Sequence, residues 1–256
     1  ESISKWLAEG LDPTQPAFVG NQNGDVKAAI ASAAKTVEAV YGYPYQNHAC
    51  MEPMNATARY TPEKCEVWTG TQNGEAAFAA VLAASGLPAD KCEVYKQMLG
   101  GGFGRRGRSD YVTQAVLIAK QMPGIPVKLI WSRKEDMQHD FCHPATFHRL
   151  RAGLSRDGLP VAWEHWIVGS PYASGAEDIP YAVPSQRIET VKVNTGIPTG
   201  PWRSVAHAYN AFAVECFIDE LDATARRDAL EYRLALLDSA PRHRAVLELA
   251  ANKSGW

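Results

Sequence analysis

A cluster of glycines between a predicted strand and a predicted helix carries the clearest chemical signal. Residues 100–107 read Gly-Gly-Gly-Phe-Gly-Arg-Arg-Gly, after a strand-like run over 92–98 and before a helix-like run over 110–119. Glycine lets backbone N–H groups turn toward a ligand, and the start of a helix favours negative charge. Arg105 and Arg106 add positive charge that cannot be lost by deprotonation. The segment therefore predicts a site for a phosphorylated or oxyanionic ligand.

The same residues allow a second interpretation, because 102–107 fit the G-x-G-x-x-G pattern of dinucleotide-binding folds. Such a fold uses an acidic residue at the end of the next strand to bind a ribose. Here the next predicted strand, 126–131, ends in Ser132 and Arg133, and an arginine there suits a 2′-phosphate. A nucleotide-binding, Rossmann-like module is thus an alternative, although Phe103 and the extra glycines fit it poorly. A glycine-rich turn without a ligand is the third interpretation.

Two other segments hold polar side chains at turns. Gln72 follows a β-branched and aromatic run, 65–69, and precedes a helical run, 76–84. An amide at such a strand-to-helix corner can donate to a ligand while its oxygen accepts another bond. Residues 202–204 follow a segment stiffened by prolines, and Arg203 can pair with a phosphate or carboxylate in a forked geometry.

Histidines and acidic residues offer weaker candidates. His48 and Glu52 lie four residues apart in a segment that neighbouring prolines make extended, and no third metal ligand lies near them. Hydrogen-bonded polar residues that line a cleft are the interpretation we prefer for this pair. A second group consists of His139, Cys142, His143 and His148. Its spacing matches no zinc pattern.

Taken in order, these segments resemble the molybdenum-cofactor-binding half of the large subunit of xanthine oxidase-type hydroxylases. The resemblance is nearest to the branch of isoquinoline 1-oxidoreductase beta subunits and related bacterial aldehyde dehydrogenases. It runs from about Val37 to the C-terminus. The His-x-x-x-Glu-Pro-Met run at 48–54, residues 67–73, the glycine cluster and the Gly-Pro-Trp-Arg-Ser segment at 200–204 carry it.

The resemblance implies a role for individual residues. The implied cofactor contacts are Gln72, Gly101, Gly102, Phe103, Gly104, Arg105, Trp202, Arg203 and Ser204. The implied substrate-pocket residues are His48, Glu52 and Val205. No protein side chain is expected to bind the metal directly. A glutamate that contacts purines in xanthine oxidases corresponds to Gly107, which disfavours a purine substrate.

The implied function is that of a molybdenum-dependent oxidoreductase, which oxidises an aldehyde or N-heterocycle with oxygen from water. The cofactor is molybdopterin with molybdenum, and its cytosine dinucleotide form is one option. Electrons pass to an iron–sulfur small subunit. The C-terminal half of the large subunit is a second partner, and a cytochrome is an optional third. The family's catalytic glutamate lies in a Gly-x-Gly-Glu motif that does not occur here. We therefore assign no catalytic residue, expect the chain alone to be inactive, and retain a fragment that binds without turnover as an alternative.

Composition is that of a globular protein, with 46% hydrophobic and 21% charged residues. The net charge of −2 gives no nucleic-acid or membrane-surface signature. The five cysteines form no Cys-x-x-Cys pair, so no iron–sulfur cluster is expected in this chain. No signal peptide is apparent. The resemblance implies a bacterial protein and leaves periplasm and cytoplasm both open.

The element pattern predicts an α+β fold, a two-layer mixed sheet with covering helices. Its strands and helices alternate over 65–131, a hairpin joins 146–154 to 160–168 through Asp157-Gly158, and a helix spans 206–225. We expect three consecutive parts: an N-terminal helix and linker (1–35), a first cofactor-binding lobe (36–170), and a loop with a helical segment (171–256).

Overall fold

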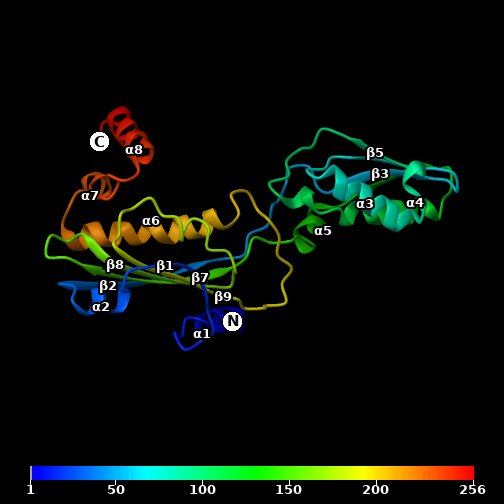
Figure 1. Cartoon of the computed structure of the whole chain (residues 1–256). Coiled ribbons are helices and arrows are strands. Elements are labelled where there is room, and N and C mark those ends of the chain that lie inside the picture. Colours follow the sequence, from blue (N-terminus) through cyan, green and yellow to red (C-terminus); the bar gives the residue numbers. More distant parts are fainter. Residues whose placement is uncertain (1) are drawn as a thin grey trace. The chain divides into compact units, whose positions relative to one another are not determined.

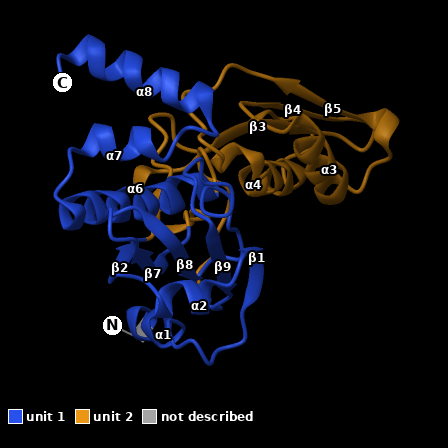
Figure 2. Ribbon diagram, turned by 60° about the vertical axis from the view of Figure 1, so that its left-hand side comes forward, with its two compact units in different colours: residues 1–44, 144–196, 206–256 blue, residues 45–143, 197–205 orange. Residues whose placement is uncertain are grey.

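The chain folds into two compact units, each assembled from segments that are separated in sequence (Figure 2). The computed structural model describes residues 2–256. Unit 1 contains the chain up to residue 44, residues 144–196 and residues 206–256, whereas unit 2 contains residues 45–143 and 197–205. These units do not coincide with the three consecutive parts expected from the sequence. The strand at 35–43 pairs with the strand at 146–154, so the chain leaves unit 1 and later returns to it.

Unit 1 is built on a five-stranded mixed sheet with the order β1-β9-β8-β7-β2. Its strands are β1 (Phe18–Asn23), β2 (Lys35–Tyr43), β7 (Thr146–Leu154), β8 (Pro160–Val168) and β9 (Ser185–Val191). The predicted hairpin is confirmed as β7 and β8, with Gly158 at φ +77° in its turn. β9 joins β8 in parallel, and the remaining pairs are antiparallel. β1 lies in the segment expected to be a linker, and β9 was not predicted.

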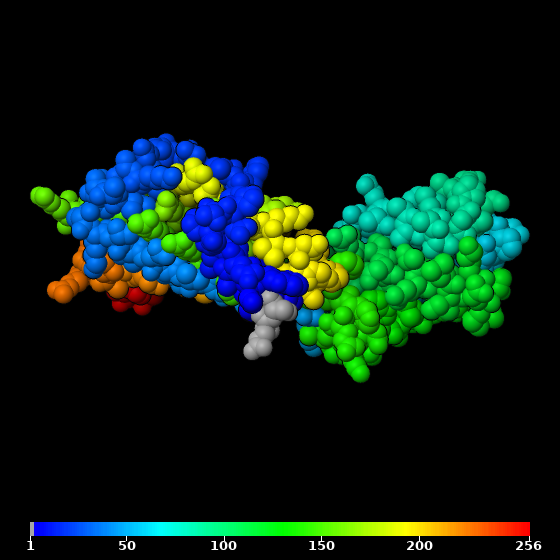
Figure 3. Space-filling view, turned by 90° about the horizontal axis from the view of Figure 1, so that it is seen from below, coloured from blue at the N-terminus to red at the C-terminus, as the bar shows by residue number. Residues whose placement is uncertain are grey.

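Helices cover both faces of this sheet (Figure 1). α6 (Ala206–Ala225) lies along one face. There the rings of Trp163 and Phe217 pack edge to face, with their centroids 5.1 Å apart. α1 (Ser2–Glu9) and α2 (Val26–Ala31) lie on the opposite face, and Figure 3 shows the N-terminal residues covering it. α7 (Ala229–Ala235) and α8 (Pro241–Ser254) follow α6. None of the helices between residues 2 and 256 combines the length and apolarity of a membrane span.

Two histidines are fully buried where β7 pairs with β8. Nδ1 of His148 lies 3.0 Å from Nε2 of His165, and Nε2 of His148 lies 2.8 Å from the Thr146 hydroxyl. Burial lowers the pKa of His148 to about 3 and also holds the pKa of His165 well below its usual value. Both imidazoles are therefore neutral at neutral pH.

We expect this pair to make unit 1 sensitive to acid. Each histidine in the unfolded chain binds a proton near pH 6.5, whereas in the folded chain it does not until the pH is far lower. The free energy of unfolding is therefore unaffected by these histidines above pH 6.5. Below pH 6.5 it decreases by up to about 1.4 kcal/mol per pH unit for each histidine. For His148 this loss ends near pH 3. Denaturant unfolding measured between pH 7.5 and 4.5 checks the slope.

A double variant, His148→Leu with His165→Leu, should flatten this pH dependence because leucine takes up no proton. His243→Leu is the matched control, since His243 is exposed on α8 and should leave the slope unchanged. A double variant with the wild-type slope would show that other groups cause the acid sensitivity.

Unit 2 is a two-layer unit with a four-stranded sheet in the order β5-β4-β3-β6. Its strands are β3 (Asn55–Tyr60), β4 (Cys65–Thr69), β5 (Cys92–Lys96) and β6 (Val127–Ile130). Its helices are α3 (Gly74–Ser85), α4 (Asp110–Lys120), α5 (Arg133–Gln138) and the 3₁₀ turns η1 (Ala89–Lys91) and η2 (Arg105–Gly107). The alternation predicted over 65–131 is confirmed, although β3 was not predicted. The α+β class holds, with two mixed sheets in place of the single sheet expected.

The topology of unit 2 differs from that of a dinucleotide-binding fold. β5 precedes the glycine cluster and is an edge strand, while β6, which follows α4, lies at the opposite edge. In dinucleotide-binding folds the strand before the glycines is central, and the next strand pairs beside it in parallel. The strand arrangement therefore does not support the Rossmann-like alternative.

Candidate functional site

Gln72 and the glycine loop, residues 100–107, meet at one edge of the unit 2 sheet. They follow β4 and β5, which are parallel neighbours, so their carboxyl ends lie together. Oε1 of Gln72 accepts hydrogen bonds from the N–H groups of Gly104 (3.0 Å) and Arg106 (3.2 Å). A Cβ atom on Gly102 would lie 2.5 Å from that oxygen, so only glycine permits this approach. The amide nitrogen of Gln72 has no hydrogen-bond partner within residues 2–256.

The Arg106 side chain holds the loop from inside the protein. Its guanidinium is fully buried and donates to the carbonyl oxygens of Gly101 (2.8 Å), Gly70 (3.3 Å) and Glu52 (2.8 Å). It also pairs with Oε2 of Glu52 at 2.9 Å, and the same oxygen accepts the Gly100 N–H at 2.6 Å. Partial burial raises the pKa of Glu52, but its hydrogen bonds and the Arg106 charge outweigh burial and lower it. Glu52, expected in the substrate pocket, is thus an ionised anchor of the loop.

The Arg105 guanidinium also points into the protein, which differs from its expected contact with the cofactor. It is 1% exposed and forms a two-bond pair with Asp110, at 2.9 and 2.8 Å. Its Nε lies 3.2 Å from Oδ1 of Asp140, within ion-pair range but without hydrogen-bond alignment. The rings of Trp131 and Phe141 lie 5.5 and 5.2 Å from its central carbon. A buried cation requires such partners, so its side chain is committed to the protein.

His48 connects Asp140 to the segment before the Trp-Arg turn. Its Nδ1 lies 2.9 Å from the Asp140 carboxylate, and its Nε2 lies 3.0 Å from the carbonyl oxygen of Pro201. Burial raises the pKa of Asp140, but hydrogen bonds from the ring and backbone of His48 outweigh it, and the pKa lies below its usual value. Both ring nitrogens of His48, expected in the substrate pocket, thus face protein partners. The Pro201 carbonyl also abuts the loop, since a Cβ on Gly104 would lie 1.8 Å from it.

The turn at residues 202–205 closes with a hydrogen bond of 2.7 Å from the Val205 N–H to the Trp202 carbonyl. The Trp202 ring lies 5.4 Å from the His143 ring, and its indole N–H is buried without a hydrogen-bond partner in the described chain. Arg203 is exposed and lies with its guanidinium 5.5 Å from the centroid of the Phe103 ring. Within residues 2–256 Arg203 forms no ion pair. The turn therefore supplies a free cation beside the glycine loop.

Backbone strain gathers in the same region. Phe103, Ser204 and Val205 have φ values of +55°, +66° and +49°, and Ala49, next to His48, has +46°. Each such residue costs about 1–3 kcal/mol and persists only where its surroundings impose it. Such residues concentrate at functional sites, so the strain supports a functional role for both segments.

Both segments contain backbone N–H groups that have no acceptor among the described residues. In the loop these are the N–H groups of Gly101, Gly102 and Phe103, and in the turn those of Trp202, Arg203 and Ser204. The Trp202 indole and the Arg203 guanidinium add two further donor groups. No acidic side chain belongs to this set, so the donors suit an anionic ligand.

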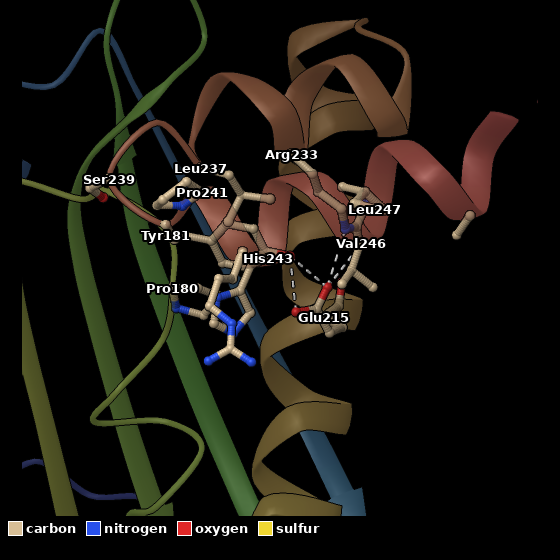
Figure 4. A pocket seen from close by; sticks show the side chains of 13 residues that line it. Pro180, Tyr181, Glu215, Arg233, Leu237, Ser239, Pro241, His243, Val246 and Leu247 are labelled. Carbon is tan, nitrogen blue, oxygen red and sulfur yellow. Dashed lines mark hydrogen bonds and ion pairs between the residues drawn. The ribbon is translucent and has the colours of Figure 1, made fainter.

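A separate groove of about 960 Å³ lies in unit 1 beside α8 (Figure 4). Tyr181 donates to the Glu215 carboxylate at 2.9 Å, and Glu215 pairs with Arg233 at 3.1 Å. Val246 and Leu247 form part of its apolar wall. These polar groups satisfy one another, and none of the predicted site residues lines the groove.

Residue by residue, the structure brings Gln72, Gly102, Phe103 and Arg203 together, as their order in the sequence predicts. It also adds Asp140 and Arg106, which the sequence-based site did not include. Nothing in the sequence separates Asp140 from the other acidic residues. Arg106 is adjacent to a chosen residue, but its anchoring contacts lie with distant backbone carbonyls.

The chain belongs to the family described as molybdopterin cofactor-binding domain, which residues 11–236 match. It is 29% identical over 230 residues to isoquinoline 1-oxidoreductase subunit beta of Brevundimonas diminuta, covering 81% of this chain and 29% of that protein. It is 28% identical over 251 residues to a membrane-bound aldehyde dehydrogenase of Gluconacetobacter polyoxogenes, named as pyrroloquinoline-quinone-dependent, covering 89% and 32%. The chain thus spans about a third of the length of these relatives.

The fold agrees with this family. The aldehyde oxidoreductase of Desulfovibrio gigas superposes with a TM-score of 0.71 at 22% identity, covering 87% of this chain and 26% of that one. The resemblance inferred from the sequence is therefore confirmed, and so is the α+β fold of the molybdopterin-binding type.

Proposed function

We propose that this chain binds molybdopterin with molybdenum between the glycine loop and the 202–205 turn. In this proposal it is the cofactor-binding part of an oxidoreductase that hydroxylates an aldehyde or an N-heterocycle. The observation that carries the proposal is the donor set of the two segments, in which backbone N–H groups, an indole and a guanidinium have no acceptor among residues 2–256. The names of the relatives favour the substrate class.

The cofactor, when bound, supplies the redox chemistry, and the chain positions it. The N–H groups of Gly101, Gly102 and Phe103 hold anionic oxygens, and Arg203 adds a charge-assisted bond. Gln72 fixes the loop through its oxygen, which leaves its amide nitrogen free to donate to the cofactor.

The substrate pocket is the less defined part of the proposal. Val205 is 47% exposed, so its side chain is available to a substrate. His48 and Glu52 act through the segments that they hold. The resemblance implies that other members have an aromatic residue at the position of Val205, so we propose a pocket that places the substrate without ring stacking there.

We further propose that electrons leave through an iron–sulfur subunit and that the remaining half of the large subunit completes the site. A cytochrome as the next acceptor and the cytosine dinucleotide form of the cofactor belong to the same proposal. Turnover requires a general base, and the family's Gly-x-Gly-Glu motif does not occur in this sequence. The chain by itself should therefore bind without turnover.

The proposal predicts that Arg203→Ala lowers cofactor retention far more than it lowers stability. Arg203 is exposed and has no ion pair in the described chain, so folding depends little on it. A charge-assisted hydrogen bond to an anion contributes about 1.5–3 kcal/mol, roughly a tenfold to hundredfold change in retention. Molybdenum and pterin per chain, measured beside the melting temperature, test this expectation.

Arg203→Lys is the matched control, because it keeps the charge and loses the planar fork. Its cofactor retention should lie between that of the wild type and that of Arg203→Ala. Normal molybdenum in Arg203→Ala would remove this residue from the site, and a wild-type protein that takes up no molybdopterin would end the proposal as a whole.

A further inference from the structure

We propose that Asp140 and His48 are positioning residues that join the glycine loop to the 202–205 turn. They form the centre of a buried ion network within unit 2, and this network sets the spacing of the two groups of cofactor donors. The identity of the ligand in this inference rests on the proposed function. The structural link between the loop and the turn is independent of that function.

Asp140 occupies the centre of the network. Its Oδ2 accepts the His48 backbone N–H at 2.7 Å, and its Oδ1 accepts the Phe141 N–H at 2.8 Å. The same Oδ1 lies 3.2 Å from Nε of Arg105 in the glycine loop. The side chains of His48, Asp140 and Arg105 are each 1% exposed, so water does not screen their interactions. One carboxylate therefore holds a loop residue and the histidine together.

His48 extends the network to the turn. Its Nε2 lies 3.0 Å from the carbonyl oxygen of Pro201. Its Nδ1 lies 2.9 Å from the ionised Asp140 carboxylate. The imidazole of His48 therefore bridges Asp140 and the residue before Trp202.

Charged groups of opposite sign meet inside this network. The Arg105 guanidinium faces the carboxylates of Asp110 and Asp140, and the Asp140 carboxylate also faces the His48 ring. Removing one member leaves a buried charge without its partner, which is strongly unfavourable. The network is therefore a rigid connection, and the contact between Pro201 and Gly104 depends on it. The spacing between the Phe103 and Arg203 donors follows from that contact.

Hydrogen–deuterium exchange of the 256-residue chain tests the link without any cofactor. Protected N–H groups report each side, namely those of Gly104 and Arg106 in the loop, of Val205 in the turn and of Gly200 just before it. Asp140→Asn should raise exchange in both segments by at least about tenfold, because it releases Arg105 and His48 together.

Two amide variants at His48 separate the two directions of the network. His48→Asn keeps a donor near the Nδ1 position but loses the bond to Pro201, so it should raise exchange in the turn and spare the loop. His48→Gln can place its amide nitrogen near the Nε2 position and should restore protection of the turn. These variants keep both carboxylates beside Arg105, so they test the link even where Asp140→Asn fails to fold.

Val81→Ala is the control for loss of stability. Val81 is fully buried in α3, among the core residues beneath α4, and touches neither segment of the network. It should lower the melting temperature and raise exchange across unit 2 without singling out the loop and the turn. Uniform exchange of this kind in Asp140→Asn, or no change in either segment, would overturn the inference.

Cofactor retention separates this inference from the proposed function. In the enzyme that contains this chain, His48→Asn should lower molybdopterin retention at least about tenfold, and His48→Gln should recover it. A wild type without molybdopterin, but with the predicted exchange pattern, would refute the proposed function and leave the link intact. Normal retention and normal exchange in His48→Asn, with molybdopterin in the wild type, would refute the link alone.

Discussion

Gly104→Ala is expected to lower cofactor retention strongly, because the added methyl group displaces the 202–205 turn from the glycine loop. Gly104 has φ +113°, a conformation that residues with a side chain rarely adopt. Its added Cβ would lie 1.8 Å from the Pro201 carbonyl oxygen, so either the glycine loop or the turn must move. Strain alone costs about 1–3 kcal/mol. With the displaced turn we expect a loss in retention of over about a hundredfold.

Gly107→Ala provides a closely matched control. It adds the same methyl group to the same loop, where no atom lies within 4 Å of the new Cβ and φ lies outside the left-handed range. It should retain the cofactor as the wild type does. Measuring molybdenum and pterin per chain for both variants tests whether the contact between Gly104 and Pro201 is needed for cofactor binding. Equal retention in Gly104→Ala and Gly107→Ala would mean that the loop and the turn need not touch for binding.

Arg106→Met is expected to have the largest effect on the stability of unit 2. Methionine fills the space of the arginine stem but removes every hydrogen bond to the carbonyls of Gly70, Gly101 and Glu52. It also leaves the Glu52 carboxylate without its cation. The Glu52 side chain is 37% exposed, so water screens this loss in part. The main cost, about 1–3 kcal/mol, comes from the buried carbonyl oxygens that are left unpaired. Denaturant unfolding of the chain measures this loss.

The control for this prediction is Arg108→Met, a neighbouring arginine that is exposed and rests on the Phe141 ring at 4.9 Å. Its loss should cost at most about 1 kcal/mol, as for an exposed cation–π contact. A similar small loss in Arg106→Met would contradict the anchoring role that the geometry gives to this residue.

Local features of the chain followed from its sequence. The hairpin at 146–168, the helix at 206–225 and the glycine loop were predicted because periodic apolar positions, the Asp-Gly turn and glycine act over a few residues. The resemblance also implied cofactor contacts from Gln72, Phe103 and Arg203, and the structure places these residues close together. Their roles toward a cofactor stay predictions until the variants above are measured.

Elements that depend on distant partners were missed. β9 is stabilised by pairing with β1 and β8, and β3 by pairing with β4 and β6, and neither strand has a strong pattern of its own. The division into two units has the same origin. Unit 1 is closed by pairing of β2 with β7, and the intervening residues form unit 2.

The sequence by itself determined which chemical groups the site contains: glycines that free backbone N–H groups, arginines, an amide and a tryptophan. Only the tertiary structure decided where the charges point. Arg105 and Arg106, adjacent to free donors, face inward because their carboxylate and carbonyl partners come from other parts of unit 2, with Glu52 lying 54 residues from Arg106. His48 reaches Asp140 across 92 residues and Pro201 across 153. A residue's type is local, whereas the partner that satisfies a buried charge is found only when the chain folds.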